Sequence, residues 1–427
     1  MPTDANTVEP AAALLGDEVR DVRETTCCIV GGGPAGVMLG LLLARRGVPV
    51  VVLESHKDFD RDFRGDTIQP STLEVLDQLG LAARMLETIP HGQIRGLKVT
   101  TPTGDVTLAD IGRLKTKYPY IATLPQAQFL EFLVEEARRF PSFGLVMGAN
   151  VQRLVQEDGV VRGVRYRGQD NGWHEVRAAL TVAADGRFSK IRSLAGLEPV
   201  KSAPPMDVAW FRLPRRPDDP RDLGALAIHA GHLAVVLERA EEWQVGYVIL
   251  KGSFQQLRES GLEALQRSFA ELVPWLADRV GLLTDWKQVS VLSVESSRLR
   301  RWHEPGLLLI GDAAHVMSPV GGVGINVAIQ DAVVAANLLA EPLQGGPLQE
   351  RDLAAVQTSR EWPVRVIQGV QERMQKLIVA QALQPGKSFR LPLLLRIVLR
   401  LPVLRDFPAR MIAFGARRVR VEESPRR

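Results

Sequence analysis

The feature that most restricts the fold of this chain is a glycine-rich turn between an apolar run and a helix pattern near the N-terminus. Gly31, Gly33 and Gly36 follow the run 27–30 with the spacing G-x-G-x-x-G, and the helix pattern covers 37–46. In such a turn the first glycine permits a tight bend, the second lets a pyrophosphate approach the backbone, and the third lets the helix pack closely on a sheet. The free N–H groups at the helix start can then hold phosphate oxygens. The sequence therefore predicts a strand–turn–helix unit that binds a dinucleotide.

An acidic residue closes the next apolar run, 48–53. Glu54 lies 18 residues beyond Gly36, where a carboxylate can accept hydrogen bonds from the ribose hydroxyls of an adenosine. The same carboxylate would repel a 2′-phosphate, so this site is not expected to bind NADP. These residues are compatible with either FAD or NAD.

A second apolar run, 180–184, leads into a short Asp-Gly motif. Asp185 and Gly186 form the motif, and Ser189 and Arg192 follow at the start of a predicted helix. The order of strand, polar turn and helix is that of the first motif.

A third apolar run, 307–310, leads into Gly311 and Asp312. A glycine-rich stretch, 319–326, then precedes a helix that we expect to reach about residue 340. The order of apolar run, polar turn and helix is thus repeated a third time.

These three motifs, in this order, resemble those of the group A flavoprotein monooxygenases, the para-hydroxybenzoate hydroxylase-like family. The resemblance extends from about residue 26 to about residue 345. It implies an α/β (α+β) fold in which a Rossmann-type FAD-binding domain is interleaved with an antiparallel-sheet substrate domain and followed by C-terminal helices. The implied division is a mobile tail (1–25), a discontinuous FAD-binding domain (26–90, 126–199 and 299–345), a substrate domain (91–125 and 200–298) and a C-terminal helical region (346–427).

The resemblance also assigns cofactor-binding residues. Asp312 would bind the ribityl chain of FAD, and the backbone of 322–326 would face the flavin pyrimidine ring, where a helix start stabilises the negative charge of the reduced flavin. Pro319 and Gly322 would lie at the reactive flavin edge and are the candidate catalytic residues. The full cofactor-binding set is Gly31, Gly33, Pro34, Ala35, Gly36, Arg45, Glu54, Arg64, Gln126, Asp185, Gly186, Gly311, Asp312, Gly322, Val323, Gly324, Ile325 and Asn326.

Some of these assignments have ordinary structural alternatives. Asp185 and Gly186 would touch both FAD and the arriving nicotinamide cofactor. Arg64 either reaches phosphate or ribityl oxygens of FAD or makes a loop salt bridge, and Gln126 either lies near the flavin or simply starts a helix. His315, close to Asp312 in the sequence, is either a general base or a structural residue, and we favour the structural role.

The chemistry that the resemblance implies needs few side chains. NADH or NADPH reduces FAD, oxygen adds to the reduced flavin at C4a, and the hydroperoxide transfers one oxygen atom to a small, commonly aromatic substrate. The protein holds the flavin, orients the substrate and excludes water. Other FAD chemistry stays open, namely a halogenase-like enzyme, a quinone or prenyl-chain reductase, an oxidase, or a non-enzymatic FAD-binding protein. The W-x-W-x-I-P segment expected of a halogenase does not occur.

The segment 200–298 supplies strands that would wall the substrate pocket. We expect these strands at 207–213, 225–237 and 243–250. Four aromatic residues are candidates either for the pocket or for the core of the sheet: Trp210, Phe211, Trp243 and Tyr247.

Composition excludes several other classes of protein. A net charge of +4 with a pI near 9.2 is too weakly basic to indicate nucleic-acid binding. The only cysteines, Cys27 and Cys28, are neighbours, which favours a reducing cytoplasm over a disulfide, and no spacing fits a metal site. Neither a signal sequence nor a transmembrane run is expected.

The C-terminal region combines helix patterns with basic residues. A helix pattern covers 352–383, and a stretch rich in Leu, Ile, Val and Arg follows it. The arginines of that stretch include Arg390, Arg396, Arg400, Arg405 and Arg410. Such helices either lie on an anionic membrane surface, pack on the FAD-binding domain or form a dimer contact. A monomer, a homodimer and peripheral membrane contact all stay open.

Overall fold

The first strand, β1 (Val19–Val30), begins earlier than the sequence predicted. It pairs in parallel with β2 (Val50–Glu54) and with β11 (Trp173–Ala183). Residues 19–25, which we assigned to a mobile tail, therefore belong to a strand. Their side chains are mostly polar and largely exposed, so the apolar pattern does not extend to them. Their backbone nevertheless pairs with β11. The computed structural model describes residues 18–60, 66–101, 104–202, 204–379, 382, 383, 401 and 405–422.

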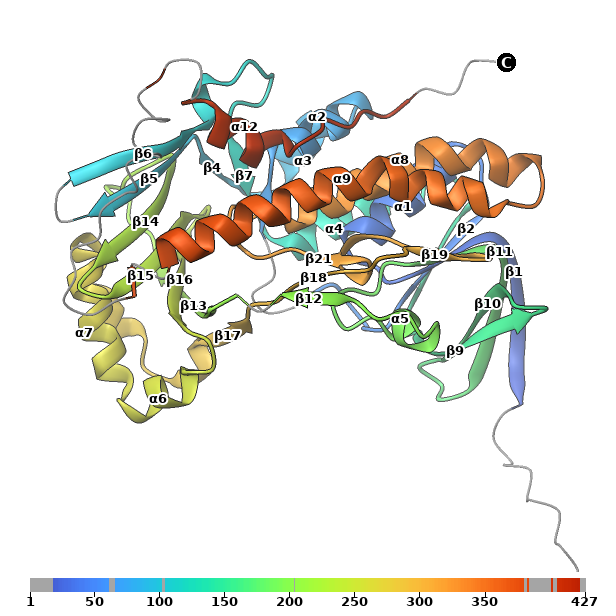
Figure 1. Cartoon of the computed structure of the whole chain (residues 1–427), viewed down its shortest axis with the longest axis horizontal. Helices are drawn as coiled ribbons and strands as arrows, with labels where there is room; N and C mark the ends of the chain where they lie inside the picture. Colours follow the sequence, from blue (N-terminus) through green and yellow to red (C-terminus); the bar gives the residue numbers. More distant parts are fainter. Residues whose placement is uncertain are drawn as a thin grey trace, which may run out of the picture.

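The parallel strands form the centre of an eight-stranded sheet in the order β19-β20-β11-β1-β2-β8, and β10 and β9 extend it from β11 (Figure 1). The added strands are β8 (Phe143–Met147), β9 (Asn150–Glu157), β10 (Val160–Arg167), β19 (His303–Glu304) and β20 (Leu307–Leu309). Helices α1 (Pro34–Arg45), α4 (Gln126–Ala137) and α8 (Gly324–Gly345) cover one face. Cys27 packs on that face and Cys28 on the other, as strand alternation predicts.

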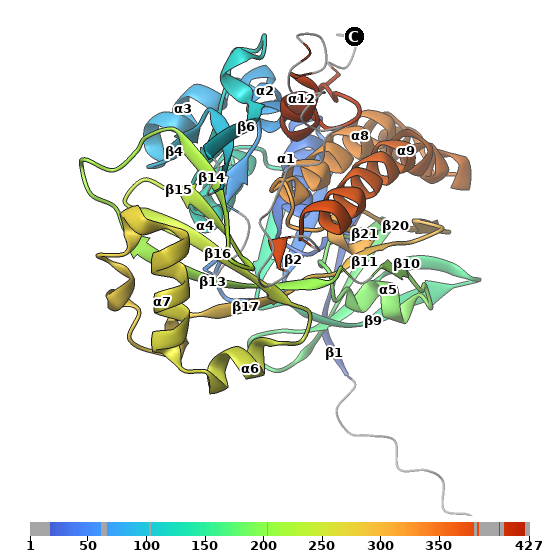
Figure 2. The ribbon, with the colours of Figure 1, turned by 60° about the vertical axis from the view of Figure 1, so that its left-hand side comes forward.

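A second, seven-stranded sheet has the order β17-β13-β16-β15-β14-β5-β6. Its strands are β5 (Gly96–Thr101), β6 (Gly104–Asp110), β13 (Met206–Pro214), β14 (Leu223–His229), β15 (His232–Glu238), β16 (Glu242–Leu250) and β17 (Ser290–Ser293). Helices α6 (Phe254–Glu259) and α7 (Leu262–Leu272) lie on the side turned away from α8 (Figure 2).

The single strand predicted at 225–237 is wrong. The chain turns at Ala230 and Gly231, which both have positive φ angles of 49° and 87°. Such a two-residue turn joins antiparallel strands tightly, and β14 and β15 pair on either side of it. Apolar residues continue through both strands, so the pattern hides the turn.

Two small sheets lie between the large ones. One has the order β3-β7-β4 and the other β12-β18-β21. Their strands are β3 (Thr67–Ile68), β4 (Gly92–Ile94), β7 (Ile121–Thr123), β12 (Val200–Ser202), β18 (Ser296–Arg298) and β21 (His315–Val316). Figure 1 shows β12 and β18 in the region where the chain passes between the two large sheets.

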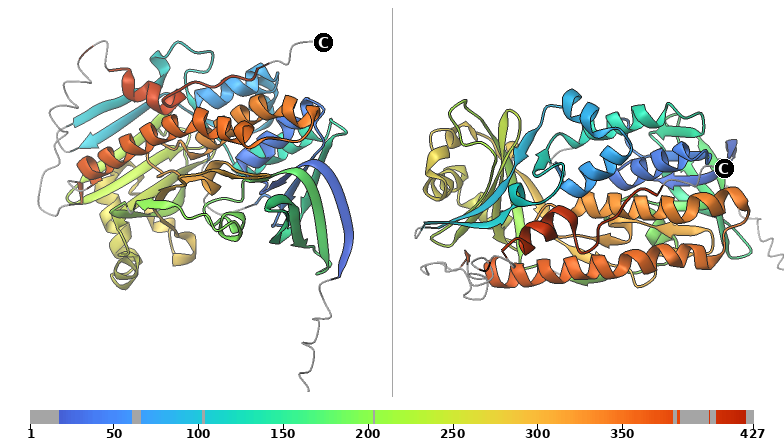
Figure 3. Two further views of the ribbon diagram at one scale, coloured as in Figure 1. Left: turned by 45° about the vertical axis from the view of Figure 1, so that its right-hand side comes forward. Right: turned by 90° about the horizontal axis from the view of Figure 1, so that it is seen from above.

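Two long helices run side by side across the molecule (Figure 3). They are α8 and α9 (Glu350–Met374), and a π-helical turn, Gln375–Val379, continues α9. The remaining helices of the described residues are α2 (Pro70–Gln78), α3 (Ala82–Thr88), α5 (Lys190–Leu194) and α12 (Phe407–Phe414), with 3-10 turns at 111–113, 274–276, 280–282, 286–288 and 311–313.

The described C-terminal residues pack on the rest of the chain. In α12, Ala409, Ala413 and Phe414 are buried against the segment that carries β4, β6 and β7. The backbone N–H of Val421 donates to the side chain of Gln78 at 2.9 Å. The stretch with Arg390, Arg396 and Arg400 lies outside the described residues, so its membrane contact stays a prediction. Within the described residues, no helix combines the length and apolar character needed to cross a membrane.

Candidate active site

Two of the three glycines in the first motif are required by backbone contacts. Gly31 has a φ of 109°, and a Cβ atom there would lie 2.3 Å from the carbonyl oxygen of Ala184. A Cβ atom at Gly36 would lie 1.9 Å from the carbonyl oxygen of Gly31. The first contact brings the turn against the second motif, and the second seats α1 against the turn.

Gly33 differs from its two neighbours in the motif. A Cβ atom there would meet no atom of the described chain within 4 Å. Gly33 is the N-cap of α1, and Pro34 and Ala35 begin the helix. The first N–H groups of a helix have no partner within it. Space beside the turn and free donors at the helix start together fit the pyrophosphate of a dinucleotide.

Glu54 ends β2 next to this turn, as its spacing predicted. Its buried carboxylate accepts hydrogen bonds from the backbone N–H of Gly32 at 2.8 Å and of His56 at 2.9 Å. Both bonds fix the carboxylate beside the open position at Gly33. A ribose attached to a phosphate at the helix start would therefore have an acceptor at hand.

Arg45 does not reach the turn. It lies in the last turn of α1 and donates to the carbonyl oxygen of Leu79 at 3.3 Å. At about 1.5 Å per residue, the helix separates it from Gly33 by roughly 18 Å. We therefore remove Arg45 from the predicted cofactor-binding set. Arg64 lies outside the described residues.

The second motif has a buried acid with a spare oxygen. Asp185 Oδ2 accepts from the backbone N–H of Ile191 at 3.1 Å, while Oδ1 has no hydrogen-bond partner in the described part of the chain. Burial raises the pKa of Asp185. A buried polar atom without a partner is costly, so a ligand donor at this oxygen would stabilise the site. Gly186 follows with a φ of 82°.

Arg192 joins the second motif to the third. Its guanidinium donates to the carbonyl oxygens of Ala313 at 3.0 Å and of Arg187 at 2.7 Å. On the other side, a Cβ atom at Gly311 would lie 3.3 Å from the Cβ of Ala35 in the first motif. All three motifs therefore meet around Gly311, which precedes Asp312.

A buried ionic cluster holds the third motif in place. Asp331 Oδ2 accepts from the backbone N–H of Gly311 at 3.0 Å and bonds His315 Nε2 at 2.6 Å, and Oδ1 accepts from Arg360 Nε at 2.7 Å. Burial opposes ionisation of the carboxyl, but His315 and Arg360 outweigh it and lower the pKa of Asp331. This bond gives His315 a structural role. Neither Asp331 nor Arg360 was predicted from the sequence pattern.

The loop 318–322 is fixed on one side by the segment that starts α2. Thr67 Oγ1 donates to the carbonyl oxygen of Gly322 at 2.9 Å, and Gln69 Nε2 donates to those of Gly321 and Gly322, both at 3.2 Å. A Cβ atom at Gly322 would lie 2.7 Å from Thr67 Oγ1. Since Gly322 also has a positive φ of 60°, glycine is required there.

Glutamines of α9 fix the same loop from the other side. Gln371 Nε2 donates to the carbonyl oxygens of Ser318 at 2.9 Å and of Val320 at 2.7 Å. Gln375 Nε2 bonds Ser318 Oγ, and Gln368 Nε2 donates to the carbonyl oxygen of Val316 at 3.1 Å. The loop that carries Pro319 is thus held rigidly where it leads into α8, whose first turn contains Gly324, Ile325 and Asn326. Sequence reasoning missed these glutamines, although their spacing along one face of a helix could have indicated them.

Replacing Gln371 by leucine is expected to lower the free energy of unfolding by about 2 kcal/mol or more, because two buried carbonyls lose their donor. Urea unfolding of the purified protein measures the change. Glu372→Gln, at the neighbouring and largely exposed position, is the control. A difference between wild type and Gln371→Leu below about 0.5 kcal/mol, typical of surface substitutions, would contradict this role.

Gln126 begins α4, and its backbone N–H bonds the carboxylate of Asp66. Asp66 Oδ2 also lies 2.9 Å from Arg239 Nη1, and both side chains are buried. Arg239 precedes β16 of the seven-stranded sheet, so this ion pair joins the start of β3 to the second sheet. Burial outweighs the attraction of Arg239 and raises the pKa of Asp66 to about 6.

Asp66 should make stability depend on pH in the acid range. Its folded pKa lies above its ordinary value of 3.8, so the folded protein binds the extra proton and its stability falls as pH rises through about 6. The difference in unfolding free energy between wild type and Asp66→Asn is expected to fall by about 2 kcal/mol from pH 4.5 to pH 7. Asp105→Asn, at an exposed position, controls for the loss of one carboxylate. A pH-independent difference would show that Asp66 does not titrate there.

The two faces of the seven-stranded sheet divide the predicted aromatics. Phe211, Trp243 and Tyr247 are buried in the cluster that includes α7. Trp210 is half-buried on the opposite face, in the cluster that receives Val320 of the loop 318–322 and Met374 of α9. Trp210 therefore faces the site, and the other three form the core behind the sheet.

Known proteins resemble this chain over most of its length. The FAD binding domain family matches residues 24–368. The 6-methylpretetramide 4-monooxygenase of Streptomyces rimosus is 36% identical over 413 residues, which cover 94% of this chain and 95% of that protein. The solved structure of OxyS anhydrotetracycline hydroxylase from Streptomyces rimosus has a TM-score of 0.72 at 24% identity and covers 91% of this chain and 76% of that one. For p-nitrophenol 4-monooxygenase PnpA from Pseudomonas putida DLL-E4 the TM-score is 0.71 at 22% identity, covering 92% and 94%. The structural likenesses show the fold.

Proposed function

This chain belongs to the FAD binding domain family and is an FAD-dependent monooxygenase, and from that premise we propose that it hydroxylates an aromatic substrate of several fused rings with NADPH or NADH and O2 as co-substrates. The predicted resemblance to the group A flavoprotein monooxygenases and the predicted α/β fold class are confirmed.

The residues fit FAD at the meeting point of the three motifs. The start of α1 at Gly33 would hold the pyrophosphate, Glu54 a ribose, and Asp312 the ribityl chain. Asp185 Oδ1 would accept a hydrogen bond from the cofactor or from the nicotinamide cofactor. The start of α8, at Gly324, would face the flavin ring, where its N–H groups stabilise negative charge. When bound, FAD supplies the electrons and the activation of oxygen for hydroxylation.

The proposed substrate class rests on the apolar sheet face next to the loop 318–322. Trp210 lies over Gly246, where an added Cβ would be 2.9 Å from the indole ring. Val208, Leu226 and Leu292 continue this face, and Val320 packs against it. A flat aromatic wall opposite the predicted flavin edge suits a flat apolar substrate. By their names, relatives act on 6-methylpretetramide and p-nitrophenol, which agrees with an aromatic substrate.

The side chains of this chain would orient the substrate and exclude water. Stacking on Trp210 orients an aromatic ring parallel to the indole. Four of the five backbone carbonyls of the loop 318–322 accept hydrogen bonds from the side chains of Thr67, Gln69 and Gln371. The fifth, that of Pro319, accepts from the backbone N–H of Gly322 at 3.0 Å. These carbonyls already have hydrogen-bond donors within the protein, so the loop has little tendency to bind water. Excluding water from the site suppresses the loss of activated oxygen as peroxide.

The test is NADPH and NADH oxidation by the FAD-loaded protein across a panel of fused-ring phenols, p-nitrophenol and quinones, with oxygen uptake and peroxide followed together. A fused-ring phenol is expected to accelerate NAD(P)H oxidation and to gain one oxygen atom. Trp210→Ala should raise the KM for that phenol without changing flavin content. Phe211→Leu, on the other face, is the control and should leave the KM unchanged. If only quinones stimulate turnover and no product gains oxygen, a reductase replaces this proposal.

We further propose a cytoplasmic location. Cys27 and Cys28 are free and buried, and burial raises the pKa of both thiols, so neither is suited to disulfide formation. A monomeric or homodimeric state and peripheral membrane contact stay predictions.

A further inference from the structure

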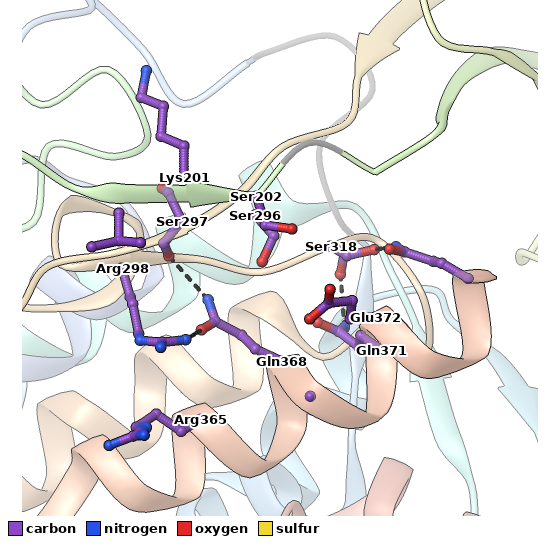
Figure 4. Close-up of a pocket in the computed structure, with 13 residues that line it drawn as sticks. Lys201, Ser202, Ser296, Ser297, Arg298, Ser318, Arg365, Gln368, Gln371 and Glu372 are labelled. Atoms are coloured by element: carbon purple, nitrogen blue, oxygen red, sulfur yellow. Dashed lines mark hydrogen bonds between the residues drawn. The ribbon is translucent and has the colours of Figure 1, made fainter.

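A polar pocket of about 360 Å³ lies behind the loop 318–322, between β12 and β18 on one side and α9 on the other. Figure 4 shows Lys201 and Ser296 above α9, with Ser318 close to Gln371 and Glu372 of the helix. None of the motifs that would hold FAD lines this pocket, which we call the α9 pocket. Its walls come from segments far apart in the chain, which no sequence pattern connects.

The α9 pocket is rich in positive charge. Lys201, Arg298 and Arg365 line it, against one acid, Glu372. Glu372 is already paired with Lys376 at 2.7 Å, whereas the closest carboxylates to Lys201 and Arg365 lie at 3.8 and 3.9 Å. Serine hydroxyls complete the wall. Cations with weak partners beside hydroxyl donors are suited to a phosphate group.

Arg298 is the best placed of the three cations. Its guanidinium contacts the neutral side chain of Gln368, Nη1 to Oε1, at 3.4 Å, and it is less exposed than Lys201 or Arg365. Gln368 in turn donates to the backbone of Ser297 at 2.9 Å. The guanidinium is therefore positioned by a neutral neighbour and keeps its charge available to an anion.

Gln371 connects the pocket to the predicted flavin edge. It is 5% exposed and lines the pocket, and its Nε2 holds the loop 318–322 by two hydrogen bonds. Its Oε1 is buried and has no hydrogen-bond partner among the described residues. An unpaired acceptor of this kind favours a ligand that also carries a hydroxyl group. A nucleotide carries both phosphate and hydroxyl groups and is therefore suited to this pocket.

We propose that the α9 pocket binds a phosphate group of the nicotinamide dinucleotide that reduces the flavin. This inference rests on the proposed function, which requires NADPH or NADH to reach the flavin edge. The glycine-rich turn cannot serve both dinucleotides at once, since FAD would occupy it, and Glu54 there disfavours a 2′-phosphate. The α9 pocket supplies the missing phosphate site, and Ser318 in its wall is the residue before Pro319. Its phosphate is either the 2′-phosphate of NADPH or the pyrophosphate common to both cofactors.

Binding of two non-reactive probes to the FAD-loaded enzyme tests the proposal and separates the two phosphates. Calorimetry with 2′,5′-ADP reports on a 2′-phosphate site, and calorimetry with ADP-ribose reports on a pyrophosphate site. Arg298→Gln is expected to weaken the probe that binds wild type by about tenfold or more, the effect of one charge-assisted contact. Lys201→Gln should weaken the same probe, with flavin content unchanged in both variants.

Arg301→Gln is the matched control, because Arg301 is a nearby exposed arginine paired with Glu350 at 2.6 Å and does not line the pocket. It should bind the probe as wild type does. In rapid flavin reduction, Arg298→Gln should raise the half-saturating NAD(P)H concentration and leave the limiting rate unchanged.

Probe binding does not depend on turnover, so it remains informative even if no aromatic substrate is found. The proposal is overturned if neither probe binds wild type, or if Arg298→Gln and Lys201→Gln bind as tightly as Arg301→Gln. It is also overturned if the two variants change only the KM for the aromatic substrate, since the pocket would then bind the substrate.

Discussion

Gly33→Val is expected to give a folded protein that has lost FAD. A Cβ atom at this position meets no described atom of the chain within 4 Å, so we expect the fold to tolerate the valine side chain. The same group would fill the space in front of α1 that a pyrophosphate needs. We expect FAD affinity to fall at least about a hundredfold, the equivalent of about 3 kcal/mol. The ratio of flavin to protein absorbance after purification measures the loss, and circular dichroism checks the fold.

Two other glycines make the test specific. Gly96→Val also places a side chain in open space, but in β5 of the other sheet, and should keep its FAD. Gly36→Val should fail to fold, because its Cβ would overlap the carbonyl oxygen of Gly31 at 1.9 Å. Full flavin content in folded Gly33→Val would contradict the assigned position of the pyrophosphate.

Asp331→Asn is expected to lower the free energy of unfolding by about 3–5 kcal/mol, the usual cost of breaking a buried ion pair. The substitution leaves Arg360, which is fully buried, without its charged partner and weakens the bond from His315. It also disturbs the backbone of Gly311, so FAD should bind more weakly. Urea unfolding of wild type and variant measures the first effect.

The double variant Asp331→Leu with Arg360→Met distinguishes a buried charge from lost packing. Removing both charges should recover most of the stability, because apolar groups can replace a buried pair at little cost. A single variant Asp331→Asn within about 1 kcal/mol of wild type would show that the cluster does not hold the third motif.

FAD binding could be predicted from the sequence because the three motifs use short local patterns. Each motif is a strand, a turn and a helix start, and in the first motif two of the three glycines are required by backbone contacts. Gly31 and Gly36 meet such contacts, and Gly33 meets open space. Arg45 was assigned from the resemblance alone, and it lies in the last turn of α1, at the opposite end of the helix from Gly33.

The support around the site could not be predicted, because it joins segments far apart in the chain. Gln371 bonds the backbone of Ser318, and Gln69 bonds that of Gly322. A side chain that binds a distant carbonyl leaves no periodic pattern near itself. Strand alternation placed Trp210 and Phe211 on opposite faces, but only the structure shows which face meets the loop 318–322.

The most direct test of the central claim is hydroxylation under ¹⁸O2 by the FAD-loaded enzyme, with NADPH or NADH and the fused-ring phenol that best stimulates NAD(P)H oxidation. Mass spectrometry of the product follows the origin of the added oxygen. Our account predicts a product that carries one ¹⁸O atom for each NAD(P)H consumed. A product whose added oxygen comes from water, or NAD(P)H oxidation that yields only peroxide with every phenol tested, would contradict it.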